Sequence, residues 1–390
     1  MKLLLAYSVR NVWVRSSTAA LTIAGLALVS LILLAVLMLG NGLNRALVES
    51  GSPDNVLLLR KGATTEIASG IYRDQAHIVR TLADITQTTD GEPLAIPELV
   101  VLISLAKSGA ETPANVVVRG TRPDAFRLRP QVRLSQGRTW QPGTTEIVIG
   151  AQIATRFLRD GIGTHLRIGK RDWLVVGITE AQGTAFESEI WGDVDQLMST
   201  YGRDSYSSLT LRLSSSSAFQ SIDDAIAADT RLLLQVKRER DYYREKSMTM
   251  ATFIRLLGFT FTFIFAVGAV LGGTMTMYGA VASRTREIGM LRALGFRPRQ
   301  ILSALLFESL MLGALAGLLA IGGGMALQFV TLSTMNFSTF SELAFRLTLT
   351  PASALATLGF ALGISIVGGI PPAIRAARLS VAAALRAPGR

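Results

Sequence analysis

The chain has 390 residues, of which 49% are hydrophobic and only 17% are charged, and its formal net charge is +11. Soluble domains carry about 25% charged residues, so this composition excludes a disordered chain and argues against a wholly soluble one. The absence of cysteine excludes disulfides, thiolate nucleophiles and cysteine-ligated metal sites. Only His77 and His165 could serve a histidine-based metal centre or catalytic triad. The composition therefore predicts a membrane protein.

The first apolar stretch predicts a membrane-spanning helix over residues 17–41. No charge occurs between Arg15 and Arg45, and a bilayer core about 30 Å thick needs roughly 20 apolar helical residues. A cleaved signal peptide is the alternative. We favour an anchor because the apolar run of about 23 residues exceeds the usual signal-peptide core, and no A-x-A-like cleavage site follows it.

Residues 42–250 form a large insert with the pattern of an α+β domain. Short β-branched or alternating segments, separated by glycine and proline, predict strands at 56–60, 99–105, 115–120, 146–150, 166–168, 173–178 and 208–213. Helical patterns cover residues 152–159 and 221–229. About 210 residues are enough to bury one or two hydrophobic cores.

Three further charge-free stretches predict membrane-spanning helices at 251–279, 301–331 and 351–372. A segment at 280–300 joins the first two of these helices, and a loop at 332–350 joins the last two. The predicted fold class is therefore a membrane protein with four transmembrane α-helices. A large α+β extracytoplasmic domain is inserted between helices 1 and 2.

The distribution of charge predicts the orientation. Residues 1–16, 282–300 and 374–390 carry net charges of +3, +4 and +4, which together account for the whole net charge. Basic short segments stay on the cytoplasmic side of a membrane. We therefore place 1–16, 280–300 and 373–390 in the cytoplasm and both 42–250 and 332–350 outside, in the periplasm of a bacterial inner membrane. This sorting explains the basic charge without a nucleic-acid partner.

Motifs for nucleotide binding or hydrolysis are absent from the sequence. The run from Gly163 to Lys170 resembles a phosphate-binding loop, but its spacing is one residue too long, and Arg171 replaces the required hydroxyl. No G-x-S-x-G or H-E-x-x-H motif occurs. His165 lies in the same turn, and a lone histidine has no partners for metal binding. We predict that the chain is not an enzyme and binds no metal.

Two charged residues fall inside predicted spans. Arg255 lies one turn inside the second span, and Glu308 lies about two turns inside the third. Such residues are candidates for a proton or substrate path. We favour the simpler interpretation that Arg255 snorkels outward and that Glu308 pairs with arginines near the interface.

Pairs of glycines recur at four-residue spacing inside the predicted spans. This spacing lets helix backbones approach closely in lipid, and it predicts tight packing within a bundle or a dimer without naming the partner. The pairs are Gly268 and Gly272, Gly313 and Gly317, and Gly359 and Gly363.

The segment 283–302 predicts a short amphipathic helix at the cytoplasmic surface. Ile288, Leu291 and Leu294 recur at three-residue spacing, and Gly295 followed by Pro298 ends the pattern. An interfacial helix resting on anionic lipid is one interpretation. The position of Glu287 between two spans favours a lever that docks into a soluble partner.

Two separated motifs resemble the signature of MacB/FtsX/LolE-type ABC transporter permeases. They are REIGMLRALGF at 286–296, followed by Glu308, and GIPPAIRAARLSVAAALR at 369–386. Within the insert, VRGTRPDAFRL at 118–128 and EIVIGAQIA at 146–154 are similar to the MacB-type periplasmic core domain. The resemblance extends over nearly the whole chain.

The resemblance implies a half-transporter that works by mechanotransmission. Such permeases form dimers, here a homodimer or a heterodimer, and bind a cytoplasmic ABC ATPase. The ATPase contacts it implies are Arg284, Arg286, Glu287, Met290, Arg292 and Gly295. The helix at about 230–250 corresponds to a stalk that relays movement to the outer domain. This chain is expected to bind no cofactor, because ATP and Mg²⁺ are expected on a separate ATPase subunit.

Three functions are open at this stage. The first is export or extraction of an amphiphile, peptide, antibiotic or lipid, with a periplasmic membrane-fusion adaptor as a further partner. The second is an FtsX-like signalling device that regulates cell-wall hydrolases without moving cargo. The third, a membrane-anchored sensor without an ATPase, leaves the motif at 286–296 unexplained. The size of the insert and its MacB-like motifs favour the first.

Overall fold

The computed structural model describes residues 16–108, 113–158, 161–335 and 341–379. The chain divides into two compact units. The sheet unit comprises Gly42–Thr252 and Thr331–Arg346, and the helical unit comprises Met1–Asn41, Phe253–Val330 and Leu347–Arg390. The predicted cytoplasmic segments at 1–15 and 380–390 lie outside the described residues.

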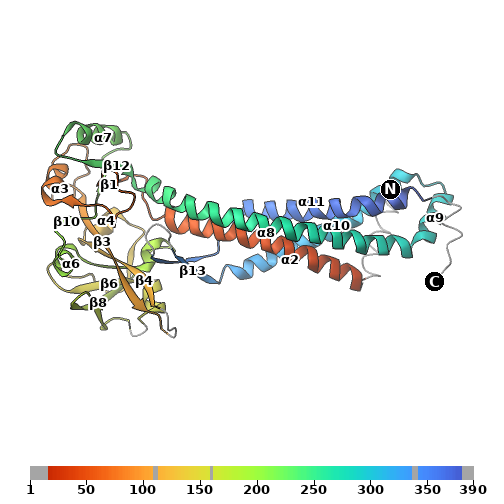
Figure 1. Ribbon diagram of the computed structural model, residues 1–390, viewed down its shortest axis with the longest axis horizontal. Coiled ribbons are helices and arrows are strands. Elements are labelled where there is room, and N and C mark those ends of the chain that lie inside the picture. Colours follow the sequence, from red (N-terminus) through yellow and green to blue (C-terminus); the bar gives the residue numbers. More distant parts are fainter. Residues whose placement is uncertain (1–15, 109–112, 159–160, 336–340, 380–390) are drawn as a thin grey trace. The chain divides into compact units, whose positions relative to one another are not determined.

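The sheet unit is built on a ten-stranded mixed sheet (Figure 1). The strand order is β12-β1-β11-β3-β4-β9-β6-β8-β5, with β7 paired to β8. Its strands are β1 (Asn55–Arg60), β3 (Ala95–Ala106), β4 (Pro113–Thr121), β5 (Arg133–Gly137), β6 (Glu146–Gly150), β7 (His165–Ile168), β8 (Arg171–Glu180), β9 (Glu189–Asp193), β11 (Ser208–Arg212) and β12 (Leu234–Arg238). The seven predicted strands are confirmed, and β5, β9 and β12 are additional.

Short elements complete the sheet unit. Strands β2 (Ile71–Tyr72) and β10 (Ser205–Tyr206) form a separate two-stranded sheet. The helices are α3 (Arg73–Arg80), α4 (Ala125–Leu128), α5 (Ala151–Arg156), α6 (Val194–Tyr201) and α7 (Ala218–Ala228), with a 3₁₀ turn η1 (Ala185–Ser188). Helices α5 and α7 correspond to the two predicted helical patterns.

The sheet is buried on both faces at strand β1. In β1, Val56 and Leu58 belong to one apolar cluster, whereas Leu57 and Leu59 belong to a second cluster on the other face. A strand covered on both sides needs no polar residue at alternate positions, which explains why β1 is a continuous apolar run. The second cluster also contains Tyr242, so α8 (Glu239–Ser283) begins within this core.

Helix α2 (Ser16–Val48) runs past its predicted bounds, and the predicted stalk helix is shorter than expected. Helix α2 continues beyond residue 41, because Leu43 and Leu47 in its last turns are buried. The predicted stalk at 230–250 requires a correction, since residues 234–238 form the edge strand β12 and the helix starts only at Glu239. Pairing with β1 satisfies the backbone groups of this segment that face β1.

The helical unit contains the greater part of α2 and α8, together with α9 (Thr285–Ala293), α10 (Pro298–Leu327) and α11 (Pro351–Ala377). In the described part of the chain, α2, α8, α10 and α11 are long and apolar enough to cross a membrane. Proline at the first position of α10 and α11 costs no hydrogen bond and defines where each begins. Figure 1 shows α10 and α11 side by side.

The predicted loop at 332–350 contains a β-hairpin. Strands β13 (Thr331–Met335) and β14 (Glu342–Arg346) pair antiparallel and belong to the sheet unit. The carboxylate of Glu342 forms ion pairs with Lys107, at 2.6 Å, and with Arg156. These two cations, which come from the sheet unit, hold the hairpin in place.

A glycine-to-alanine pair on α2 tests how tightly this helix packs against the hairpin. A Cβ atom at Gly42 would lie 2.2 Å from the carbonyl oxygen of Arg346, whereas a Cβ at Gly25 would meet nothing within 4 Å. We expect Gly42→Ala to lower the free energy of unfolding by about 1–3 kcal/mol because the β14 backbone must shift. Gly25→Ala should be neutral or stabilise by up to about 1 kcal/mol. Thermal unfolding of the full chain in detergent measures both, and equal effects would contradict this packing.

Candidate functional site

Six buried charged side chains of the sheet unit are joined by ion pairs and are here termed the charge cluster. Its members are Glu66, Glu98, Arg119, Arg129, Glu189 and Glu239, and none is more than 7% exposed. They come from β3, β4, β9, the loop after β1, the residue after α4 and the first residue of α8. Sequence patterns did not indicate this cluster, because its members lie far apart along the chain.

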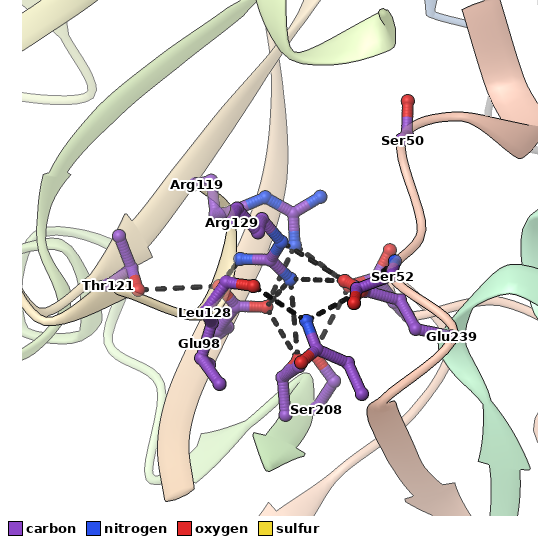
Figure 2. Close-up of polar contacts among 12 residues, drawn as sticks. Ser50, Ser52, Glu98, Arg119, Thr121, Leu128, Arg129, Ser208 and Glu239 are labelled. Carbon is purple, nitrogen blue, oxygen red and sulfur yellow. Dashed lines mark hydrogen bonds and ion pairs between the residues drawn. The ribbon is translucent and has the colours of Figure 1, made fainter. Parts of the chain in front are cut away.

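Arg129 lies at the centre of the charge cluster (Figure 2). Its Nη1 and Nη2 atoms donate to the two carboxylate oxygens of Glu98 at 2.5 and 2.9 Å, and its Nε donates to Glu239 at 3.0 Å. Glu239 also accepts bonds from the backbone N–H of Ser52 and from the Asn55 side chain. The first residue of α8 is therefore tied to the central strand β3 and to the start of β1.

Arg119 pairs with the remaining carboxylates. Its Nε and Nη2 donate to Glu189 at 2.8 and 2.9 Å, while Nη1 donates to Glu66 at 2.9 Å and to Glu98 at 3.2 Å. The hydroxyl of Ser208 donates to Glu66 at 3.1 Å. Bidentate geometry of this kind fixes orientation as well as charge.

The electrostatics of the cluster favour its charged forms. Burial alone raises the pKa of Glu98, but attraction to Arg129 and then to Arg119 lowers this pKa to about 2. Burial likewise opposes ionisation of Glu66, and the charge of Arg119 brings its pKa below the usual value. Burial lowers the pKa of Arg129, whereas Glu98 and Glu239 raise it above its ordinary range. Each of these ions is kept charged by its partners.

The short helix α9 is the second part of the candidate site, and a helix is present where the sequence predicts it. The predicted apolar face requires a correction, because Leu294 follows the end of α9 and is 78% exposed, whereas Ile288 is buried. The buried residues of α9 are Ile288 and Gly289, and Ile288 packs in an apolar cluster with residues of α8, α10 and α11. The opposite face is exposed and consists of Arg286, Glu287, Met290 and Leu294. This arrangement presents two apolar side chains beside two charges.

The other predicted residues of this segment have structural roles. Gly295 adopts φ +95°, a conformation that favours glycine, and it ends α9. Arg292 is half-buried, and its Nε has no hydrogen-bond partner within the described residues. Arg284 requires a correction as an ATPase contact, because it is 5% exposed and turned inward. Its guanidinium pairs with Glu308 at 3.0 and 3.2 Å.

Of the two charged residues inside predicted spans, Glu308 has the arginine partner that the simpler interpretation expects, whereas snorkelling of Arg255 stays a prediction. Glu308 is paired with Arg284, as anticipated for an arginine near the interface. Arg255 is exposed. Among the described residues, no group of three or more histidines or carboxylates is arranged to hold a metal ion.

The glycine pairs differ from one another. A Cβ atom at Gly313 would lie 2.6 Å from the Ser365 side chain, and one at Gly317 would lie 2.9 Å from that of Leu358, so α10 packs closely on α11. The other four positions have open space within 4 Å, so close packing at these glycines does not occur within the described chain, and packing in a dimer stays a prediction. These four are Gly268, Gly272, Gly359 and Gly363.

Removing Arg129 tests the energetics of the charge cluster. Arg129→Gln leaves Glu98 and Glu239 buried without their main partner, so we expect the sheet unit to lose about 3–5 kcal/mol of stability. Trp140, Trp173 and Trp191 all lie in this unit, so denaturant unfolding can be followed by fluorescence. Arg138→Gln, which removes the exposed ion pair with Glu146, is the matched control and should change little. Comparable losses in both variants would contradict the assignment.

The charge cluster also predicts a loss of stability in acid. Because the pKa of Glu98 falls from 4.5 to about 2 on folding, its contribution is present above pH 4.5 and is lost as the pH falls toward 2. A shift of this size corresponds to about 3 kcal/mol. We expect the denaturant midpoint to fall across this window. In Glu98→Gln the midpoint should start lower and depend less on pH, and an unchanged pH dependence would contradict this prediction.

Comparison with protein families identifies both parts of the chain. The model of the MacB-like periplasmic core domain matches residues 19–229, and that of the FtsX-like permease C-terminal domain matches residues 259–381. The FtsX-like match includes α9 and Glu308, and the MacB-like match includes all of the charge cluster except Glu239.

Relatives whose names state a function are similar to this chain over part of their own length. The chain is 24% identical to the macrolide export ATP-binding/permease protein MacB of Bdellovibrio bacteriovorus, over 90% of this chain and 56% of that protein. It is 30% identical to the pyoverdine export ATP-binding/permease protein PvdT of Pseudomonas entomophila, over 62% of this chain and 38% of that protein. The chain thus spans about half the length, or less, of these relatives.

A solved structure is also similar. The periplasmic region of MacB from Actinobacillus actinomycetemcomitans is 13% identical, with a TM-score of 0.39, over 51% of this chain and 94% of that one. Together, the two family models leave only short segments of the chain unmatched. The chain therefore belongs to the family of ABC transporter permeases that combine a MacB-like periplasmic core domain with an FtsX-like permease domain.

Proposed function

We propose that this chain is the permease subunit of an ABC transporter in the inner membrane of a bacterium. In this arrangement α2, α8, α10 and α11 cross the membrane, both termini are cytoplasmic, and the sheet unit is periplasmic. The four apolar helices and the placement of all the net positive charge in 1–16, 282–300 and 374–390 support this topology.

The observation that carries the proposal is the division of α9 into two faces. Ile288 anchors one face to the bundle, while Met290 and Leu294 on the other are 49% and 78% exposed. Apolar side chains beside Arg286 and Glu287 have the composition of a protein-binding patch, with an apolar centre and a charged rim. A helix resting on lipid would instead turn its apolar face toward the bilayer. The partner we propose is a cytoplasmic ABC ATPase that binds ATP and Mg²⁺.

The transport cycle follows from this docking. Closure of the ATPase on ATP would displace α9, and the helices joined to it would pass the movement to the periplasmic sheet unit. This is mechanotransmission, in which the permease binds no nucleotide. A second permease copy would complete the transporter, and a periplasmic membrane-fusion adaptor would receive the cargo.

Export or extraction is favoured over signalling. The MacB-like core domain occupies more than half of the chain, and relatives that share it are named as exporters of macrolides and of pyoverdine. We propose a cargo of the same broad kind, an amphiphile, peptide, antibiotic or lipid taken up on the periplasmic side. Regulation of cell-wall hydrolases by an FtsX-like device is the alternative.

Reversing one charge on the exposed face of α9 tests the docking. We expect Glu287→Lys to abolish stimulation of the ATPase by the permease without unfolding the protein, because the side chain is exposed in the first turn of α9. Co-purification of the ATPase from the native host and its hydrolysis rate in nanodiscs give the readout. Asp224→Lys, an exposed charge reversal on α7, is the control. Full stimulation by Glu287→Lys would refute docking at α9.

A further inference from the structure

The junction between α8 and α9 is a single residue long. Helix α8 ends at Ser283 and α9 begins at Thr285, and Arg284 between them has φ −111° and ψ 11°, outside the helical range. A break of one residue at the end of a long helix is a natural hinge, because a change of two dihedral angles reorients everything that follows. Something must therefore determine the direction in which α9 points.

Arg284 is held from inside the helical bundle. Its Nη1 and Nη2 atoms donate to the two carboxylate oxygens of Glu308 at 3.0 and 3.2 Å. Glu308 lies on α10, about 15 Å along that helix from Pro298. Arg284 and Glu308 are 5% and 7% exposed.

The surroundings of this pair are apolar. Met277 and Val281 of α8, Ile301 and Leu305 of α10, and Ile288 of α9 form one buried cluster at this end of the bundle. Loss of either partner would leave the other ion buried and unpaired, which is strongly destabilising. The bidentate geometry also fixes the plane of the guanidinium.

Among the contacts that hold α9, two reach the interior of the bundle from the same face. One is the burial of Ile288, and the other is the Arg284–Glu308 pair one turn earlier on the same face. The backbone N–H of Ile288 donates to the Arg284 carbonyl at 2.9 Å, so the two attachments belong to one rigid turn. An apolar contact alone permits sliding and rotation, whereas a bidentate ion pair does not.

We propose that Glu308 is the positioning residue of α9. Through Arg284 it sets the angle of α9 and ties this helix to α10 as well as to α8. A push on α9 then moves both helices, instead of being absorbed by rotation at the one-residue junction. The direction of coupling rests on the proposed function, whereas the position of α9 is a property of this chain alone.

The first experiment measures the position of α9 without any partner. The sequence contains no cysteine, so Met290→Cys on α9 and Leu318→Cys on α10, both exposed, can carry spin labels in nanodiscs. We expect a narrow distance distribution in the otherwise native chain and a clearly broadened or shifted one in Glu308→Gln. Ser303→Ala is the control, because Ser303 is exposed on α10 and its hydroxyl donates to the Gln300 carbonyl of its own helix. An unchanged, narrow distribution in Glu308→Gln would overturn the proposal.

A double variant separates positioning from stability. Arg284→Met with Glu308→Met replaces the ion pair by apolar side chains, and such exchanges are often neutral or stabilising. We expect a thermal midpoint at or above that of the native chain together with a distance distribution that remains broad. A narrow distribution in the double variant would show that packing alone positions α9 and would overturn the proposal. This variant also provides the test if Glu308→Gln does not fold.

The second experiment adds the ATPase. Stimulation of hydrolysis by Glu308→Gln should fall about 2- to 30-fold relative to the native chain, the range found for residues that modulate coupling between sites. Undiminished stimulation alongside a broadened distance distribution would overturn the coupling role. If the native chain itself recruits no ATPase, the proposed function fails, and the distance measurements still decide whether Glu308 positions α9.

Discussion

A charged side chain can be buried only where its charge is matched, and this constraint determines the middle of the sheet unit. Glu98 has no exposed surface, and it is stable as an anion because Arg129 and Arg119 donate to both of its oxygens. The same two arginines pair with Glu66, Glu189 and Glu239. Strands β3, β4 and β9, the turn after α4 and the start of α8 must therefore meet in one arrangement, because any other leaves a buried charge unmatched.

The same constraint acts at both ends of α8. Glu239, its first residue, accepts from Arg129 in the sheet unit, and Arg284, directly after its last residue, donates to Glu308 in the helical unit. Between these residues the helix is largely apolar and exposes many of its side chains, among them Phe259, Phe263 and Met275. Side chains of this kind suit a lipid environment, and they do little to fix the orientation of the helix. Ion pairs thus fix the position of α8 at its two ends, whereas its exposed apolar middle is suited to lipid.

This division suits the function we propose. A helix that transmits force must be attached firmly at its ends, because a loose end converts displacement into local rotation. Buried bidentate pairs supply such attachments, whereas the exposed face of α9 remains available to a partner. The hairpin β13–β14 adds a further attachment, since Glu342 joins the connection between α10 and α11 to Lys107 of the sheet unit.

Local patterns in the sequence were sufficient to predict the apolar helices, strands such as β1 and β6, and α9. The pattern of burial on a helix or strand follows from residues a few positions apart. Local patterns did not reveal β9, whose sequence EIWGD carries an acid at each end. They also missed the edge strand β12, whose last two residues are Lys237 and Arg238. Nor could they show that Arg284 faces inward while Arg286 faces outward, since both are arginines in one basic motif. The sequence by itself determined which segments are apolar, where the charge gathers and which family motifs are present. Only the tertiary structure decided which charges are buried together, because the pairing of an ion depends on groups that folding brings from distant parts of the chain.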